Sequence, residues 1–317
     1  MNWHLNHRAQ QLVDRLLPQA DDLRIAVHDL PTGGRVIDCG VDVPGSLQAG
    51  LALARICLAD LGTVDLVSTD LAGWTWPALQ VRTDHPLAAC LFSQYAGWQI
   101  AVDKFFAMGS GPMRAAAARE ELFPQLNYHE RPETTVGVLE TRQLPGQEIF
   151  EHLAERTRVA TRATTLLVAP TASLAGTVQV VSRIVETALH KLHELRFDVT
   201  RIASALGTAP LSPVAADDLT GIGWTNDAIL YGGRVTLWVR GDDRSLEEIG
   251  PWVPSLAAPS HGRPFLQLFE EAGRDFYQLD PQLFSPAEVV FQNIETGRVH
   301  RFGKIAVDVL SQSFGLT

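Results

Sequence analysis

The stretch VVSRIVETALHKLHEL, residues 180–195, has the apolar spacing of an amphipathic α-helix. Successive helical residues are turned by about 100°, so apolar side chains gather on one stripe, while Arg183, Glu186 and His190 lie on the opposite side. We therefore predict a helix that carries an arginine and a glutamate three residues apart. The apolar stripe consists of Val181, Ile184, Val185, Ala188, Leu189, Leu192 and Leu195.

The pair of Arg183 and Glu186 has two interpretations. On an exposed helix face it would be a solvated ion pair that contributes a few tenths of a kcal/mol, which is the common case. In a closed pocket, desolvation would raise the pKa of the carboxylate and the guanidinium would lower it, leaving an ionised base that can accept a proton. The preceding residues, APTASLAGTVQVV at 169–181, are small, hydroxyl-bearing and Gly-containing, which favours close approach of a ligand.

The composition is that of a folded globular protein. Of the 317 residues, 46% are hydrophobic and 20% are charged, which excludes a disordered chain, and the length predicts two domains. The formal net charge of −10 would repel nucleic acids and anionic membranes, so neither is an expected partner.

Cysteine usage and the N-terminus indicate a reducing, cytoplasmic environment. Cys39, Cys57 and Cys90 are far apart and include no CxxC, so we predict three reduced core residues. The N-terminal residues lack the apolar run of a signal peptide, and no later stretch approaches the roughly 20 apolar residues of a membrane span.

The order of predicted elements is that of an α+β fold. Strands at 23–30 and 35–41 flank the turn PTGG, where Gly33 and Gly34 can adopt positive φ. Further strands are expected at 63–71 and 78–84. Helices are predicted at 8–17 and 45–61, and another over TDHPLAACLFSQYAGWQI, residues 83–100, with Pro86 in its first turn.

A weak internal repeat predicts two related halves. In each, an apolar helix is followed by a Phe-led segment that ends in Gly-Ser/Thr-x-Pro, at 109–112 and at 207–210. The polar, Pro-containing stretch YHERPETT, residues 128–135, is the expected boundary. We predict two α+β domains, residues 1–133 and 134–317, with a ligand pocket between them.

Several short motifs are excluded as sites. GSGP at 109–112 and GSLQAG at 45–50 lack the Lys-Ser/Thr of a phosphate loop and the glycines of a dinucleotide fingerprint, so both are read as structural turns. HKLHE at 190–194 lacks the spacing of a zinc motif, and a His190–Glu194 contact is expected instead. Because HKLHE lacks that spacing, no metal site is predicted. No GxSxG elbow occurs, so no covalent nucleophile is predicted either.

Long blocks of the chain resemble the methenyltetrahydromethanopterin cyclohydrolase family over nearly the whole sequence. Several long motifs in the same order are far more specific than any single short pattern. The blocks are VIDCGVDVPGS, TDHPLAACLFSQYAGW, FFAMGSGPMRA, LLVAPTASLAGTVQVVSRIVETALHKLHE, GTAPLSPVAADDLTGIGWTNDAILYGGRV and DFYQLDPQLFSPA.

This resemblance implies a reaction and an assembly. Family members reversibly hydrolyse the cationic methenyl bridge of a tetrahydromethanopterin-type one-carbon carrier and leave a formyl group on the pterin-ring nitrogen. They need no metal, nucleotide or permanently bound cofactor. The resemblance further implies one-carbon metabolism of the formaldehyde-oxidation type and a homotrimer of two-domain α+β subunits that bind the carrier between domains.

The resemblance also assigns roles to residues. Glu186 corresponds to the family's general base and Arg183 to the arginine that positions the water and keeps Glu186 ionised. The segment Ser93-Gln94-Tyr95 corresponds to a third, substrate-binding element, in which Ser93 and Gln94 help to frame the tetrahedral centre. Relatives often carry a lysine at the place of Tyr95, so backbone contacts of this segment are expected and the role of the tyrosine side chain is open.

Three alternatives remain at this point. The same hydrolysis could act on methenyltetrahydrofolate, which turnover on the two carriers would distinguish. A non-catalytic reduced-pterin-binding protein would bind the carrier without hydrolysis and would bind it equally after Glu186→Gln. A structural protein would have no pterin affinity.

Arg234 and Arg240 flank a strand-like run and are read as solvated surface charge. The alternative interpretation is that they bind an anionic tail of the carrier.

Overall fold

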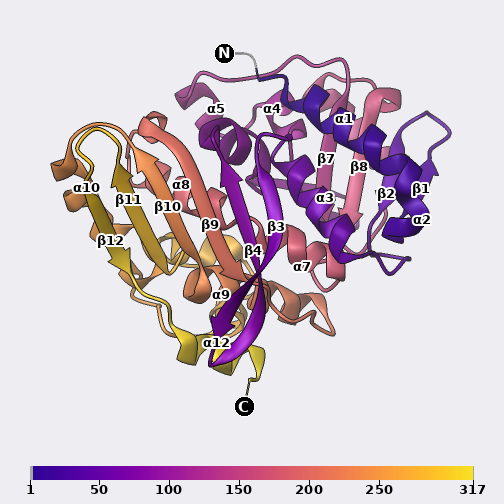
Figure 1. The fold of residues 1–317 in the computed structure, drawn as a ribbon. Coiled ribbons are helices and arrows are strands. Elements are labelled where there is room, and N and C mark those ends of the chain that lie inside the picture. The colour runs from indigo at the N-terminus through magenta and orange to yellow at the C-terminus, as the bar shows by residue number, and fades with distance from the viewer. Residues whose placement is uncertain (1–2, 317) are drawn as a thin grey trace. The chain divides into compact units, whose positions relative to one another are not determined.

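The computed structural model describes residues 3–316, which form two compact units (Figure 1). Unit 1 comprises residues 3–62 and 88–179, and unit 2 comprises residues 63–87 and 180–316. Each unit combines helices with one six-stranded sheet, so the predicted α+β class with two domains is confirmed. The chain passes between the units three times, whereas the expected single boundary at 133/134 lies inside unit 1.

The sheet of unit 1 has the strand order β1-β2-β8-β7-β6-β5. Strands β2, β8 and β7 are parallel, and the remaining neighbours are antiparallel. Nearly every residue of β7 and β8 is buried, as expected for central parallel strands that are covered on both faces. The bounds are β1 Ala26–Asp29, β2 Arg35–Asp38, β5 Trp98–Val102, β6 Phe105–Ser110, β7 Thr135–Glu140 and β8 Thr164–Ala169.

Helices cover both faces of this sheet. One core cluster joins α1, α3 and α7 to the face that includes Ile37, and a second joins α4 and α6 to the face that includes Val36. The bounds are α1 Leu5–Leu16, η1 Leu17–Gln19, α2 Ala20–Leu23, α3 Leu47–Cys57, α4 Met113–Ala117, α5 Leu122–Gln125, α6 Gln147–Thr157, η3 Thr161–Ala163 and α7 Leu174–Val181.

Most local predictions in unit 1 are confirmed. The hairpin of β1 and β2 turns at Gly33, whose φ is +87°, and α3 begins after Ser46, whose Oγ accepts a hydrogen bond from Ala49 N. The helix predicted over residues 83–100 is correct only for Leu87–Gln94, which is a π-helix, η2. From Trp98 onward the chain forms β5, whose side chains alternate between buried and exposed.

The stretch 128–135, expected as a domain boundary, lies within unit 1 and is partly buried. Glu130 is 7% exposed, and its carboxylate accepts hydrogen bonds from the backbone N–H groups of Leu5 and Asn6. It therefore caps α1, which has no side-chain cap of its own. The Asn6 side chain donates to Glu130 at 2.7 Å and to the Pro112 carbonyl at 2.8 Å, so this polar stretch is tied to distant parts of the unit.

The sheet of unit 2 has the order β12-β11-β10-β9-β4-β3. Only β10 and β11 are parallel. The hairpin β3–β4 comes from the N-terminal part of the chain and pairs with β9, so the purple and orange strands of Figure 1 lie side by side. The bounds are β3 Thr63–Leu71, β4 Trp74–Thr83, β9 Ile202–Pro210, β10 Arg234–Val239, β11 Glu288–Asn293 and β12 Val299–Gly303.

One face of this sheet packs on α8. Gly207 of β9 faces Ile184 and Val185. A Cβ at this glycine would lie 2.8 Å from one methyl carbon, Cγ2, of each of these residues. Along β10, Val235, Leu237 and Val239 are buried while Arg234, Thr236 and Trp238 are less so, the alternation of a sheet with one packed face. The helices of unit 2 are α8 Ile184–Glu194, η4 Val199–Arg201, α9 Asp218–Gly232, α10 Asp243–Ile249, η5 Gly250–Trp252, η6 Ser255–Ala257, α11 Phe265–Glu271, η7 Phe276–Gln278, η8 Pro281–Leu283 and α12 Val307–Phe314.

The state of the cysteines and the length of the helices bear on two further predictions. All three cysteines are buried thiols, as predicted. None of the helices within residues 3–316 combines the length and apolar character that crossing a membrane requires.

A buried carboxyl group connects three helices of unit 2. Asp227 of α9 accepts hydrogen bonds from Phe265 N at 2.8 Å and from Ser313 Oγ at 2.5 Å, which links α9 to α11 and α12. Burial raises the pKa of Asp227 to about 7, and the bond from Ser313 opposes that shift.

We predict that Asp227 makes unit 2 less stable as the pH rises. The unfolded carboxyl titrates near pH 4 and the folded one near pH 7, so between these values the folded state holds the extra proton and loses stability with each step upward. Asp227→Asn removes this titration. Its free energy of unfolding relative to wild type should increase by up to about 4 kcal/mol between about pH 4 and pH 8, measured by urea unfolding.

The control is Asp65→Asn, because Asp65 is exposed on β3 of the same unit. It should keep the wild-type pH dependence. An Asp227→Asn protein whose stability follows that of the wild type at every pH would show that the buried carboxyl does not titrate in this range.

Candidate active site

Arg183 and Glu186 lie at the start of α8 in unit 2. The single helix predicted across residues 180–195 is in fact parts of two helices, because α7 ends at Val181 and α8 begins at Ile184. Arg183 is the N-cap residue of α8, and its carbonyl accepts a hydrogen bond from Thr187 N at 2.8 Å. Neither Ser182 nor Arg183 is a glycine or proline, so the usual helix-breaking residues do not mark this break.

The apolar stripe of α8 is confirmed, but the opposite side is not a solvated face. Ile184, Val185, Ala188, Leu189 and Leu192 are fully buried. Glu186, on the other side, is also buried, with 4% of its surface exposed, and Arg183 is half-buried. The carboxylate is therefore desolvated and not a solvated surface group, and the closed pocket that the catalytic interpretation requires stays a prediction.

The helix itself adds to the electrostatics of Glu186. Glu186 lies in the first turn of α8, where unpaired backbone N–H groups and the helix dipole create positive potential. This potential favours the ionised form of a carboxylate. The helix terminus therefore acts against the desolvation that burial imposes.

Lys191 anchors α8 further along. Its side chain is buried, and Nζ donates to the Gln282 carbonyl at 2.7 Å and to Gln282 Oε1 at 2.5 Å. Burial lowers the pKa of Lys191 to about 8, while the charge of Asp280 opposes that shift. Because Lys191 is hydrogen-bonded to Gln282, it limits sliding of α8, the helix that carries Glu186, along its axis.

The histidines of α8 have the contact expected from their spacing. His190 Nε2 lies 3.8 Å from Glu194 Oε1, as predicted for residues four apart on a helix. Across the described part of the chain, no three His, Cys, Asp or Glu side chains are placed to hold a metal ion.

Ser93, Gln94 and Tyr95 lie at the C-terminal end of η2 in unit 1. Tyr95 N donates to the Cys90 carbonyl at 2.9 Å, which is the bond between residues five apart that defines a π-helix. Helices of this type are rare in proteins overall, and those that occur are often found at functional sites. Ser93 and Gln94 are fully buried. Among residues 3–316, the Ser93 hydroxyl is buried without a hydrogen-bond partner, which is uncommon for a polar group in a core.

The motif GSGPMR, residues 109–114, holds this segment. Gly111 N donates to the Ser93 carbonyl at 2.9 Å, and Ser110 Oγ donates to the Gln94 carbonyl at 2.6 Å. Gly111 has a φ of +87°, so a glycine is favoured at the turn. The predicted structural turn therefore also satisfies the carbonyls at the end of η2.

Further contacts connect the segment to α7 within unit 1. Ser110 Oγ lies 3.4 Å from Cys57 Sγ, and Gln179 Nε2 of α7 lies 3.5 Å from the same sulfur. Gln179 comes four residues before Arg183 in the sequence. The end of η2, the end of α3 and the end of α7 thus share one buried polar cluster.

The small residues before α7 have a structural explanation. A Cβ at Gly176 would lie 1.9 Å from the Pro170 carbonyl oxygen, and Ser173 Oγ accepts a hydrogen bond from Gly176 N. In α3, a Cβ at Gly50 would lie 2.6 Å from Val178 Cβ. These glycines permit close packing within unit 1, and the ligand approach that their composition suggested stays a prediction.

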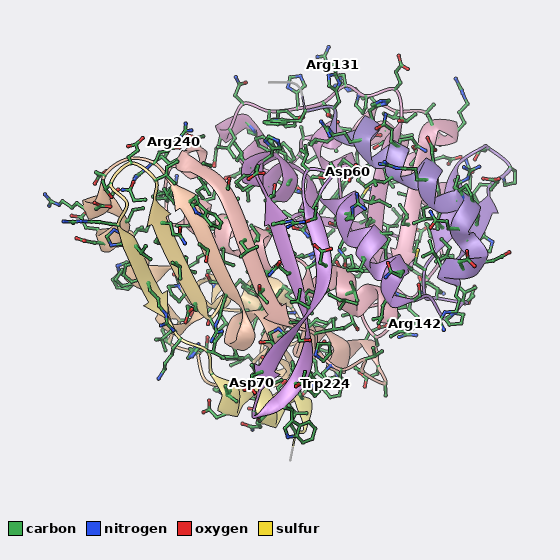
Figure 2. All side chains as sticks on the ribbon, in the orientation of Figure 1. Asp60, Asp70, Arg131, Arg142, Trp224 and Arg240 are labelled. Carbon is green, nitrogen blue, oxygen red and sulfur yellow. The ribbon has the colours of Figure 1, made fainter. Side chains whose placement is uncertain are left out.

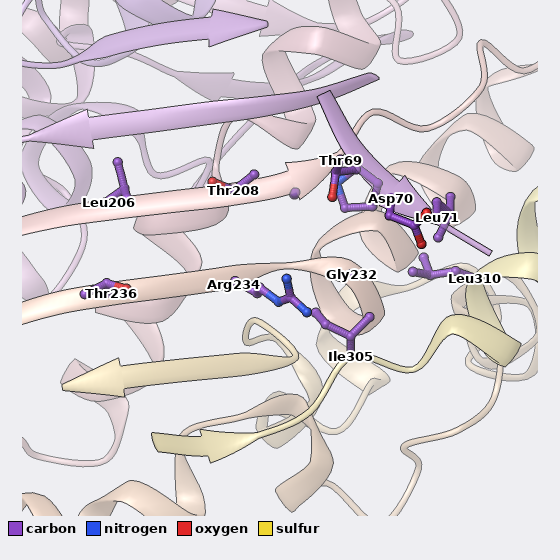
Figure 3. A pocket seen from close by; sticks show the side chains of 12 residues that line it. Thr69, Asp70, Leu71, Leu206, Thr208, Gly232, Arg234, Thr236, Ile305 and Leu310 are labelled. Carbon is purple, nitrogen blue, oxygen red and sulfur yellow. The ribbon is translucent and has the colours of Figure 1, made fainter. Parts of the chain in front are cut away.

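Arg234 and Arg240 lie at opposite ends of β10. Arg234 is 59% exposed, lies 3.8 Å from Glu288, and lines a hollow of about 290 Å³ with Thr208 and Ile305 (Figure 3). Arg240 is exposed at the other end (Figure 2). Both positions agree with surface charge, and the role of the hollow in binding a carrier tail stays a prediction.

The structure thus describes two sets of predicted site residues, each within its own unit. Arg183 and Glu186 are adjacent at the start of α8, and Ser93, Gln94 and Tyr95 are adjacent at the end of η2. Sequence reasoning missed the supporting groups, because their partners are distant in the chain. The available signal was the GSGPMR block itself.

Comparison with known proteins gives the family. A model of the family described as Cyclohydrolase (MCH) matches residues 4–314. The chain belongs to this cyclohydrolase family.

Members of the family from distant organisms match nearly the whole chain. A protein of Rhodopirellula baltica is 48% identical over 300 residues, which cover 92% of this chain and 90% of the relative. A protein of Methylobacillus flagellatus is 43% identical over 98% of this chain and 95% of its own length. One of Methanococcoides burtonii is 38% identical over 98% of both. All three relatives are named methenyltetrahydromethanopterin cyclohydrolase.

Proposed function

We propose that this protein reversibly hydrolyses methenyltetrahydromethanopterin to the formyl carrier. The observation that supports this most directly is membership of the cyclohydrolase family over residues 4–314, with relatives of that name at up to 48% identity. The burial of Glu186 beside Arg183 supports the chemistry, because a sheltered carboxylate can take a proton from water.

In the proposed first step, Glu186 removes a proton from a water molecule as the water oxygen attacks the bridging carbon. One C–O bond forms and the positive charge of the amidinium is neutralised. Attraction between the carboxylate and the cationic substrate favours binding, but it weakens as the cation disappears. Base catalysis must therefore supply more of the rate enhancement than charge pairing does.

In the proposed second step, one C–N bond of the tetrahedral centre breaks. The proton held by Glu186 passes to the departing nitrogen, while the hydroxyl group loses its proton and becomes the formyl oxygen. One proton is released overall, because a cationic substrate and water become a neutral product. The reverse reaction uses the same groups in the opposite order.

The other residues assist in this proposal. Arg183 positions the water and keeps Glu186 ionised, a role that suits arginine because its guanidinium stays charged and has a rigid fork geometry. Ser93 and Gln94 frame the tetrahedral centre, and the Ser93 hydroxyl supplies a buried polar group for it. The homotrimer, the cytoplasmic location, the role in formaldehyde oxidation and the absence of a bound cofactor rest on the family resemblance.

We predict that Glu186→Gln lowers kcat by about 100-fold or more, because the amide cannot accept the proton of the attacking water. The measurement is the loss of the methenyl chromophore with purified protein and no added metal. The matched control is Glu194→Gln on the same helix, whose side chain is 58% exposed. Near wild-type turnover of Glu186→Gln would remove Glu186 as the base.

Arg183→Gln should shift the acidic limb of the pH–rate profile to higher pH. The guanidinium favours the ionised carboxylate, so its removal makes Glu186 easier to protonate and confines activity to more alkaline conditions. Arg244→Gln, on the exposed surface of unit 2, is the control. If the profile of Arg183→Gln matched the wild type, Arg183 would not tune the base.

The carrier can be tested directly. We expect kcat/KM to be higher on methenyltetrahydromethanopterin than on methenyltetrahydrofolate, since the resemblance extends over the whole chain. Chromophore loss on both carriers under identical conditions measures this ratio. A ratio that favours the folate would assign the protein to the other carrier, and tight binding without turnover on either would indicate a binding protein.

A further inference from the structure

Arg114 is a completely buried arginine next to the predicted substrate-binding segment. It lies in α4 of unit 1 with 0% of its surface exposed. Its Nη1 donates to the carbonyl of Leu91 at 3.1 Å and to that of Ser93 at 3.3 Å. These carbonyls lie in the last turn of η2, where backbone acceptors lack helical partners and a cation is favoured.

The rest of the guanidinium is fixed by three other contacts. Nε donates to Glu120 at 2.8 Å. The Cζ atom lies 4.9 Å from the centre of the Tyr95 ring and 5.5 Å from that of Phe123. Arg114 therefore contacts two of the three residues in the Ser93-Gln94-Tyr95 segment, one through its carbonyl and one through its ring.

Stability alone is a poor explanation for this arrangement. A buried charge must lose its hydration, and apolar residues of similar volume often stabilise a core equally well. The Nη2 atom of Arg114 is buried without a hydrogen-bond partner among the described residues, which adds a desolvation penalty. A group retained at such a penalty is commonly one that fixes a functional geometry.

We propose that Arg114 is the positioning residue of the Ser93-Gln94-Tyr95 segment. Its Nη1 holds the Ser93 carbonyl, and its flat face holds the Tyr95 ring, so the Ser93 hydroxyl and the Gln94 side chain keep one orientation. This inference rests on the proposed function in one respect: the segment must act on the tetrahedral centre. Arg114 itself need not touch the substrate.

The geometry predicts a particular kinetic signature. Ser93 and Gln94 are proposed to act on the tetrahedral centre and less on the bound substrate, so a displaced segment should lower kcat more than it raises KM. Misplacement by about 1 Å can lower a rate by about 100-fold. We expect Arg114→Lys to lower kcat by about 10- to 100-fold and to change KM by less than about 3-fold.

Arg114→Lys is the informative variant, because it keeps the positive charge for Glu120. An ammonium group carries its three donors on one atom, so it cannot place donors where both Nε and Nη1 of Arg114 lie, and it has no flat face for the Tyr95 ring. The matched control is Arg55→Lys, because Arg55 of α3 also pairs with an acidic residue, Asp60 at 2.7 Å, in unit 1. This control should keep wild-type kcat and KM.

A second measurement follows the segment without using activity. Hydrogen exchange by mass spectrometry of a peptide spanning residues 88–96 reports the amides at the end of η2. Exchange in this peptide should be faster in Arg114→Lys than in wild type, and unchanged in Arg55→Lys. Peptides from α6 should exchange as in wild type, which establishes that the variant is folded.

Three results would overturn the proposal. Unchanged exchange of residues 88–96 would mean that Arg114 does not hold the segment. Wild-type kcat despite faster exchange would mean that the held geometry has no part in the reaction. A rise in KM with unchanged kcat would make Arg114 a determinant of ground-state binding.

Failure of the proposed function would look different. In that case the wild-type protein itself would show no turnover of methenyltetrahydromethanopterin. The hydrogen-exchange comparison would then judge the positioning of the segment alone, with faster exchange in Arg114→Lys as the supporting result and unchanged exchange as the opposing one.

Discussion

The burial of one carboxylate, that of Glu186, is the constraint on which the interpretation of unit 2 depends. An exposed helical glutamate would be stabilised by water and would contribute little to any reaction. At 4% exposure, Glu186 loses most of that hydration, and the first turn of α8 supplies compensating positive potential, to which Arg183 adds in the proposed function. A carboxylate balanced in this way can be ionised and still basic.

That balance requires a helix that does not move. The start of α8 is fixed against the sheet, because Ile184 and Val185 pack directly on Gly207 of β9. Its last turn and a half are fixed by Lys191, which donates to both the backbone and the side chain of Gln282. Packing at one end and hydrogen bonds at the other leave the carboxylate little freedom to move into bulk solvent by a shift of the helix.

In unit 1, the buried groups that need polar partners are the backbone carbonyls at the end of η2. The end of a π-helix exposes acceptors, and in η2 these are met by Ser110, Gly111 and Arg114 from a single short motif. The Ser110 hydroxyl serves the Gln94 carbonyl, Gly111 N serves that of Ser93, and the Arg114 guanidinium serves those of Leu91 and Ser93. The identity of these three residues thus follows from the shape of the segment that they hold.

Sequence patterns predicted what depends on neighbours along the chain. The 3.6-residue period of α8 and the hairpin of β1 and β2 could both be read directly. The two units could not be delimited in this way, because Ala78 of β4 pairs with Pro210 of β9 and nothing local to either strand indicates that pairing. Likewise, Glu130 lies in a stretch that looks like a linker, and only its distant partners Leu5 and Asn6 make it part of a core. The site divides along the same line. Arg183 and Glu186 are three residues apart and could be found together. Arg114, in contrast, is recognised only through its hydrogen bonds to carbonyls that lie more than twenty residues earlier in the chain.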